Sequence, residues 1–204
     1  MSKADQAAKL LAAARKSSEE GGAAEAIKAA KEALGIFRDL GEGSGIGSAL
    51  ACLLTSQLAA GQVTLEDALS TIRDESSKLT KVGGKLGEGA LLLATGQVYA
   101  AALDSDRALK AGLEAQAIFA KEGAALQEAD AICEAETTQL MSQVYLATED
   151  AQAALSSAKD SLQVAGAVGR APEGRGRGAD RGGADSRRAP AGGPGGGAGA
   201  AVVS

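Results

Sequence analysis

Apolar residues recur at intervals of three and four positions along most of the chain. One such run places six apolar side chains on a single face of a helix, at Ala26, Ile27, Ala30, Ala33, Leu34 and Phe37. The same periodicity continues past residue 160. It predicts no strands and eight helices, over 3–19, 24–40, 44–60, 65–82, 86–103, 105–122, 124–147 and 150–165.

A longer repeat underlies these helices. Three segments share a small residue, an apolar residue eleven positions later and a glycine four positions beyond that: Ala26, Phe37, Gly41; Ala68, Leu79, Gly83; and Ala108, Phe119, Gly123. The interval from each of these glycines to the next is nearly constant. Because a fixed period of about 20 to 50 residues is typical of stacked helical arrays, the repeat predicts an all-α solenoid of about four antiparallel helix pairs.

A fourth unit fits the sequence in two registers. It begins either at Ala151, with Gly166 as its glycine, or at Ala154, with Gly169. The later register agrees with the tyrosines, because the interval from Tyr99 to Tyr145 equals the interval from Ala108 to Ala154.

The ends of the predicted helices carry their own signals. Glycine is the residue that best adopts the positive φ found just after a helix, so Gly41, Gly83 and Gly123 are predicted stops. Thr64 and Ser105 precede acidic residues and are predicted to cap the helices that follow them.

Composition agrees with a helical core. Hydrophobic residues make up 45% of the chain, but only 2% are aromatic and there is no Trp. The core must therefore consist of Ala, Leu, Ile and Val, of which Ala and Leu are strong helix formers.

The third pair resembles a tetratricopeptide repeat. Gly96, Tyr99, Ala108 and Ala115 follow one another at spacings of 3, 9 and 7, the offsets at which that family places a small residue, an aromatic residue and two alanines. Segment 33–41 resembles the longer version of the repeat, and the resemblance covers residues 1–165. It implies a right-handed α-solenoid whose concave groove, lined by the first helix of each pair, binds a peptide or a partner protein.

The resemblance also implies which residues would contact that partner. The positions that match the family's groove are neutral or carry amides: Thr55, Leu93, Gln97, Gln139 and Gln143. The Lys and Asn clamp with which some members bind a C-terminal carboxylate is absent, so we expect apolar contacts, amide hydrogen bonds and a weak dependence on salt. A regulatory or sensor module of a larger signalling protein is the alternative.

The C-terminal segment differs from the rest. Residues 166–204 contain no Leu, Ile, Phe or Lys, so we expect a folded domain over 1–165 and a disordered tail over 166–204. The Arg and Gly residues of 174–178 resemble an RNA-binding segment, but the abrupt change of composition favours a frame or gene-model artefact. The domain has a net charge of −8 and the tail +3, so we expect no binding of nucleic acid by the domain.

Several classes of chemistry are excluded. The sequence has no histidine, which removes histidine acid–base catalysis and the common histidine-containing nucleophile and zinc sites. The glycine-rich segment 41–47 lacks the spacing of a nucleotide-binding loop and is predicted to be a helix–helix turn. The cluster Glu128, Asp130, Glu134 and Glu136 is predicted to be a solvated helix face. We therefore expect no enzyme activity, cofactor, metal or small-molecule substrate.

Two further expectations concern the surroundings of the chain. Cys52 and Cys133 are predicted to be reduced core residues. No segment has the uninterrupted apolar length of a membrane span, so we expect a cytoplasmic protein that does not bind membranes. The last helix should expose an apolar edge formed by Leu155, Leu162 and Val164, which predicts self-association at the C-terminal end of the array.

Overall fold

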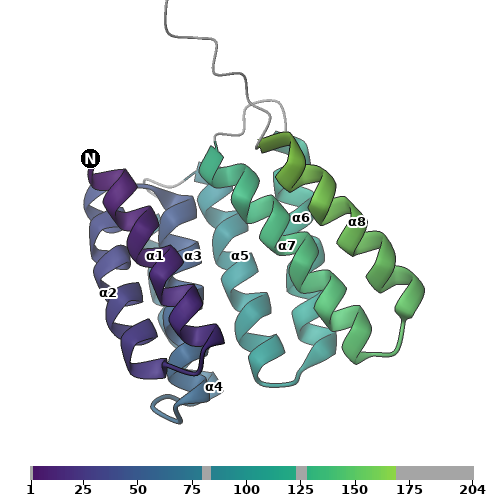
Figure 1. Cartoon of the computed structure of the whole chain (residues 1–204), viewed down its shortest axis with the longest axis horizontal. Coiled ribbons are helices and arrows are strands. Elements are labelled where there is room, and N and C mark those ends of the chain that lie inside the picture. The colour runs from purple at the N-terminus through teal and green to yellow at the C-terminus, as the bar shows by residue number, and fades with distance from the viewer. Residues whose placement is uncertain (1, 80–83, 123–127, 169–204) are drawn as a thin grey trace, which may run out of the picture. The chain divides into compact units, whose positions relative to one another are not determined.

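The residues that the structure describes form eight α-helices in the computed structural model (Figure 1). The structure describes residues 2–79, 84–122 and 128–168, with the side chains of 128–131, 151 and 161–168 excepted, and these residues contain no strand. The helices are α1 (Lys3–Glu19), α2 (Ala23–Leu40), α3 (Gly43–Ala59), α4 (Leu65–Leu79), α5 (Gly84–Ala101), α6 (Ser105–Glu122), α7 (Glu128–Ala147) and α8 (Ala151–Val168). The predicted all-α fold is confirmed.

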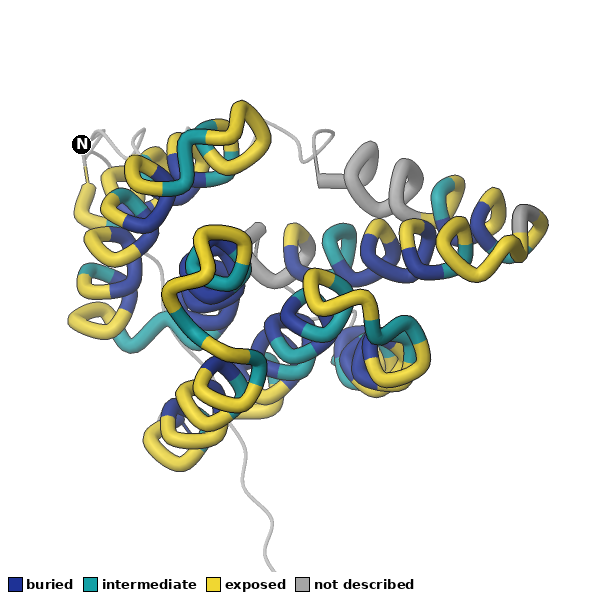
Figure 2. Tube along the Cα trace, turned by 90° about the horizontal axis from the view of Figure 1, so that it is seen from below, coloured by how far each residue is buried: buried dark blue, intermediate teal, exposed yellow. Residues whose placement is uncertain are grey.

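The helices form pairs that stack on one another. Within three of the pairs, α1 packs on α2, α5 on α6 and α7 on α8, and between pairs α3 packs closely on both α2 and α5. Buried side chains run along these contacts while the outer helix faces are exposed (Figure 2). The arrangement is that of a helical solenoid, in which each pair buries the apolar face that its neighbour leaves open.

Five of the turns between helices have the same backbone geometry. A residue one or two positions after the helix has a positive φ, at Gly21 (82°), Gly41 (71°), Gly61 (65°), Leu103 (61°) and Glu149 (63°). In each turn this residue donates its N–H to the carbonyl three positions earlier, and the next residue donates to the carbonyl five positions earlier. These bonds satisfy carbonyls that the end of a helix would otherwise leave unpaired.

The predicted glycine stop is therefore confirmed at Gly41, whereas Gly83 and Gly123 lie outside the described residues. The turns after α5 and α7 use Leu103 and Glu149 in place of glycine. No glycine pattern in the sequence marks those two turns.

One predicted N-terminal cap is confirmed and the other is wrong. Thr64 Oγ1 accepts a hydrogen bond from the N–H of Asp67 at 3.2 Å, and Asp67 Oδ2 accepts from the N–H of Thr64 at 3.1 Å. Ser105 is instead the first residue of α6, and the cap is Asp104, whose Oδ1 accepts from the N–H of Arg107 at 3.1 Å. A carboxylate one position earlier replaces the predicted hydroxyl.

The structure also decides the register of the fourth unit. Ala26, Ala68, Ala108 and Ala154 are all buried, and each donates its N–H, at 2.9–3.0 Å, to the carbonyl of the residue that precedes its helix. Ala154 is thus the equivalent of the other three, as the later register requires. Helix α8 continues through Gly166 to Val168, so the prediction that it ends at 165 is wrong.

The glycine-rich segment 41–47 is helical from Gly43 onward, which agrees with the helix predicted over 44–60 and limits the predicted turn to Gly41 and Glu42. Helix α3 begins within it, and a Cβ built on Gly45 would overlap the ring of Phe37. A Cβ on Gly47 would lie 2.7 Å from the backbone carbonyl of Ala90 in α5. These glycines allow α3 to approach its neighbours closely, which is a packing role.

A buried ion pair joins the second helices of the first two pairs. Glu75 of α4 is 3% exposed and accepts hydrogen bonds from Arg38 Nε at 2.9 Å and Nη2 at 2.6 Å, while Lys78 Nζ lies 3.3 Å away. Burial alone would raise the pKa of Glu75, but the hydrogen bonds and charges of Arg38 and Lys78 hold this pKa below its usual value. The carboxylate therefore stays charged inside the helix stack.

The predicted tail and apolar edge fall largely outside the described residues. Of the range 166–204 only 166–168 are described, as the end of α8. On the same helix Leu155 is 57% exposed, as predicted, whereas the side chains of Leu162 and Val164 are not described. Among the described helices, none is both long and apolar enough to span a membrane.

Candidate functional site: a pocket on the first helices

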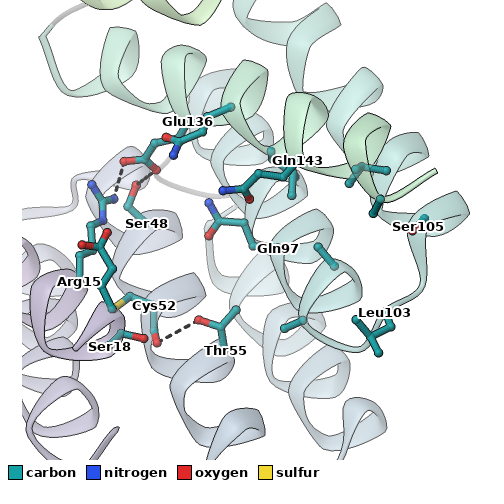
Figure 3. Close-up of a pocket in the computed structure, with 17 residues that line it drawn as sticks. Arg15, Ser18, Ser48, Cys52, Thr55, Gln97, Leu103, Ser105, Glu136 and Gln143 are labelled. Carbon is teal, nitrogen blue, oxygen red and sulfur yellow. Dashed lines mark hydrogen bonds and ion pairs between the residues drawn. The ribbon is translucent and has the colours of Figure 1, made fainter. Parts of the chain in front are cut away.

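One pocket of about 700 Å³ lies on the face formed by the first helix of each pair (Figure 3). Its lining comes from α1, α3, α5 and α7, with the α5–α6 turn at one edge. Four helices that are distant in sequence therefore contribute to one cavity. Its volume is within the range of about 300–1,000 Å³ that is common for ligand pockets.

Four of the five predicted groove residues line this pocket: Thr55, Gln97, Gln139 and Gln143. Leu93 does not. It is 1% exposed and belongs to the core cluster around Phe119, so its predicted place in the groove is wrong. The reason is geometric: Leu93 and Gln97 are one helical turn apart, and Leu93 is in the part of α5 that the neighbouring helices cover.

Three glutamine amides provide the hydrogen-bonding capacity of the pocket. Gln97 is half-buried on α5, whereas Gln139 and Gln143 are exposed and one turn apart on α7. The side chains of Gln97 and Gln143 lie next to each other across the pocket (Figure 3). Within the part of the chain that the structure describes, none of the three amides has a hydrogen-bond partner, so each can both donate to a ligand and accept from it.

Thr55 contributes less than its hydroxyl suggests. Its Oγ1 donates to the carbonyl of Ala51 at 2.8 Å, within the same helix. The hydroxyl proton is therefore used by α3, and what remains for a ligand is the acceptor oxygen and the methyl group.

Charged side chains meet at one end of the pocket. Arg15 Nη2 of α1 lies 2.5 Å from Glu136 Oε1 of α7, and Ser48 Oγ of α3 donates to Glu136 Oε2 at 3.4 Å (Figure 3). Burial raises the pKa of Glu136, and the charge and hydrogen bond of Arg15 only partly offset this effect. Glu136 therefore does not lie on a solvated helix face, which corrects the prediction for this member of the acidic cluster.

The other members of that cluster do not assemble a site. Glu134 is half-buried, and the side chains of Glu128 and Asp130 are not described. No group of three His, Cys, Asp or Glu residues among the described side chains is arranged to hold a metal ion.

Both cysteines are buried as thiols, as predicted. Cys52 lines the pocket, and its burial raises the pKa of its thiol, although the nearby charge of Arg15 acts in the opposite direction. Cys133 Sγ lies 3.4 Å from Ser48 Oγ, where α7 packs against α3. The thiol of Cys52, with its raised pKa, is mainly protonated at neutral pH and is a poor nucleophile.

The other end of the pocket is mainly apolar, and Ser105 is its one polar residue (Figure 3). Ala100, Ala101 and Leu103 line it from α5 and the following turn, and Val144 and Ala147 line it from α7. Sequence reasoning found neither Leu103 nor Arg15. The one signal for Leu103 was its place in the repeat, because the equivalent positions of the first two pairs hold Gly21 and Gly61.

Similarity to known proteins is found at the level of solved structures. No family model matches the sequence, and no curated protein matches it. Among solved structures, the crystal structure of BtubC (BKLC) from P. vanneervenii is similar, with a TM-score of 0.49 and 18% sequence identity. The match covers 85% of this chain and 68% of that one. A similarity of this extent carries no argument about family or function, so the resemblance to tetratricopeptide repeats stays a prediction.

Proposed function

We propose that this chain is a protein-interaction module that binds a short peptide segment of a partner protein in the pocket on its first helices. The observation that carries the proposal is the convergence of three glutamine amides, from α5 and α7, without partners among the described residues. A peptide backbone presents alternating N–H and C=O groups, which side-chain amides match without requiring a charge. Membership of the tetratricopeptide repeat family is part of the same proposal.

The size and charge of the pocket favour a particular kind of ligand. A cavity of about 700 Å³ suits a few residues of a peptide. Its one basic side chain, Arg15, is paired with Glu136, and the exposed Glu19 leaves the lining with one carboxylate that has no ion pair among the described residues, which disfavours an acidic ligand. We therefore expect binding of modest affinity that changes little with salt concentration.

A binding role is favoured over a catalytic one by the groups that line the pocket. The sequence offers no histidine, and the thiol of Cys52 and the carboxylate of Glu136 are held in packing and an ion pair. General acid–base and nucleophilic catalysis both need a group that is accessible and has a suitable pKa. A cytoplasmic location, where the two thiols would stay reduced, completes the proposal.

The proposal can be tested by selecting ligands directly. A library of short random peptides displayed on phage is selected against the full chain, and the enriched peptides are synthesised with a fluorescent label. Their Kd is then measured by fluorescence anisotropy at low salt and at about 300 mM salt, where charges are strongly screened. We expect enriched peptides with Kd values that differ by less than about threefold between the two salt concentrations, because the exposed carboxylate of Glu19 is the one charge of the pocket lining without an ion pair among the described residues.

Matched variants locate the binding site. Gln97→Glu combined with Gln143→Glu should weaken binding of the selected peptides by about tenfold or more, because each change removes donors and adds charge in the pocket. Gln62→Glu, an exposed glutamine on the α3–α4 turn outside the pocket, provides the control and should leave Kd unchanged. A selection that enriches no peptide, or peptides that bind the Gln97 and Gln143 variant as tightly as the wild type, would refute the proposed function.

A further inference from the structure

Leu103 occupies a backbone conformation that glycine adopts at the equivalent positions of the first two pairs. It follows α5 with φ of 61°, and its hydrogen bonds are those of Gly21 and Gly61, which follow α1 and α3. A residue with a Cβ is strained in this conformation, and a leucine has no side-chain hydrogen bond with which to offset the strain. The backbone of this turn therefore does not explain why a leucine stands there.

Packing does not explain it either. Leu103 is 90% exposed, the largest exposure among the large apolar side chains that the structure describes. A leucine that is both strained and exposed loses conformational free energy without gaining the burial that stabilises other leucines. Its side chain is nevertheless placed at the edge of the pocket (Figure 3).

The pocket lining around Leu103 is mainly apolar, and the charged residues next to it are paired with each other. Asp104, the next residue, is paired with Arg107 at 2.6 Å, and the Arg107 guanidinium lies over the ring of Tyr99, 5.0 Å from its centroid. Arg15 and Glu136 lie at the opposite end of the pocket (Figure 3). The neighbours of Leu103 in the pocket lining are alanines, from α5 and α7, and Val144, together with one polar residue, Ser105 (Figure 3).

We infer that Leu103 is a specificity-determining residue, which contacts an aliphatic or aromatic side chain of the bound peptide at the α5–α6 end of the pocket. This inference rests on the proposed function and deepens it. The partner segment then has an apolar side chain at this end and backbone that reaches the glutamine amides in the middle. Binding would cover Leu103, which supplies the burial that the free chain lacks. An acidic or basic side chain is excluded from this end because no free opposite charge is present there to compensate its desolvation.

The geometry provides a variant that separates binding from folding. Leu103→Gly removes the side chain and relieves the strained backbone, so it should raise Tm by about 2–4 °C while it weakens binding of the selected peptides by about tenfold. A change that only damaged the fold would lower both. Leu103→Asn is the second variant, because asparagine tolerates positive φ but is polar, and it should also weaken binding.

Glu149→Gly is the matched control. Glu149 has φ of 63° in the equivalent turn after α7, is exposed, and does not line the pocket. This substitution should raise Tm by a similar amount and leave Kd unchanged. The comparison uses the full chain and the labelled peptides from the phage selection, with Kd measured by anisotropy and Tm by circular dichroism.

The outcomes separate the inference from the function on which it rests. A shared apolar residue among the selected peptides, with affinity lost in Leu103→Gly but not in Glu149→Gly, supports the inference. Peptides that need the glutamines but bind Leu103→Gly as tightly as the wild type would overturn the role of Leu103 and leave the proposed function standing. If no peptide is enriched, or if the Gln97 and Gln143 variant binds the selected peptides as tightly as the wild type, the proposed function and the role of Leu103 are both refuted.

Discussion

Because α3 approaches α5 closely, we predict that one methyl group added to α3 at Gly47 lowers the stability of the fold. Gly47 lies on α3 where a Cβ would come within 2.5–2.7 Å of the Cβ, carbonyl carbon and carbonyl oxygen of Ala90. Two of these atoms belong to the backbone of α5, which cannot move away by a change of rotamer. In Gly47→Ala the two helices must therefore separate by several tenths of an ångström along their length.

The magnitude follows from two opposing effects. Overpacking a core costs up to about 3 kcal/mol, and contact with a rigid backbone belongs at the upper end of that range. Alanine in place of glycine inside a helix contributes about 1 kcal/mol of stability. We expect Gly47→Ala to lower the free energy of unfolding by about 2 kcal/mol.

Gly35→Ala is the matched control with the opposite sign. Gly35 is an exposed residue inside α2, and a Cβ built there has nothing within 4 Å. Only the helix-propensity gain applies, so the free energy of unfolding should rise by about 1 kcal/mol. The free energies of unfolding of the two variants should therefore differ by about 3 kcal/mol, although both carry the same substitution of glycine by alanine.

Urea denaturation followed by far-ultraviolet circular dichroism measures this difference. With a slope of about 2 kcal/mol/M, the midpoint should fall by about 1 M for Gly47→Ala and rise by about half as much for Gly35→Ala. A Gly47→Ala chain as stable as the wild type would refute the reasoning, because α3 and α5 could then separate at no cost. A loss of stability in both variants would instead point to a general effect of replacing glycine.

Three further predictions concern a cap, a buried carboxylate and the thiols. Asp104→Ala should lower the free energy of unfolding by about 1 kcal/mol in urea, whereas Ser105→Ala should change it little; equal losses would contradict the assignment of the cap. The pKa of Glu136 is raised in the folded state, so between the ordinary value of 4.5 and that raised value the folded chain holds more protons than the unfolded chain. The stability contributed by this group is complete at the acidic side of that window and decreases as pH rises through it. Glu136→Gln should remove this decrease when the free energy of unfolding is measured from about pH 4 to 7, and parallel profiles for the two chains would contradict the burial of the charge. Cys52 and Cys133 should react with a chromogenic disulfide reagent much more slowly in the native chain than in urea, and rapid native labelling would show that they are accessible.

The sequence predicts the helices well because two local signals agree. Apolar spacing of three and four positions defines each helix, and turn residues such as Gly41 and Thr64 mark where helices end and begin. The later register of the fourth unit was also available from the tyrosine spacing. The helices and their ends depend on residues within one or two turns of one another, whereas the register depends on the long-range repeat.

The errors arise where tertiary packing assigns a second role to a residue. The glycine-rich composition of 41–47 is typical of a turn and conflicts with the helix predicted over 44–60; the helix forms, and its glycines let α3 approach Phe37 and α5 closely. Leu93 matched the groove pattern, yet the neighbouring helices bury it. The ion pair of Arg15 with Glu136 joins the first helix to the seventh, and no local pattern in the sequence relates two residues so far apart.

That ion pair has a consequence for how the array unfolds. In a linear solenoid each repeat touches only its neighbours, so the terminal repeats can fray while the middle stays folded. Here α7 contacts α1 through Arg15 and α3 through Ser48, which couples the fourth pair to the first and the second. Loss of either terminal pair must break these contacts as well as its own interface, so the coupling raises the cooperativity of unfolding and makes the two ends of the array open together.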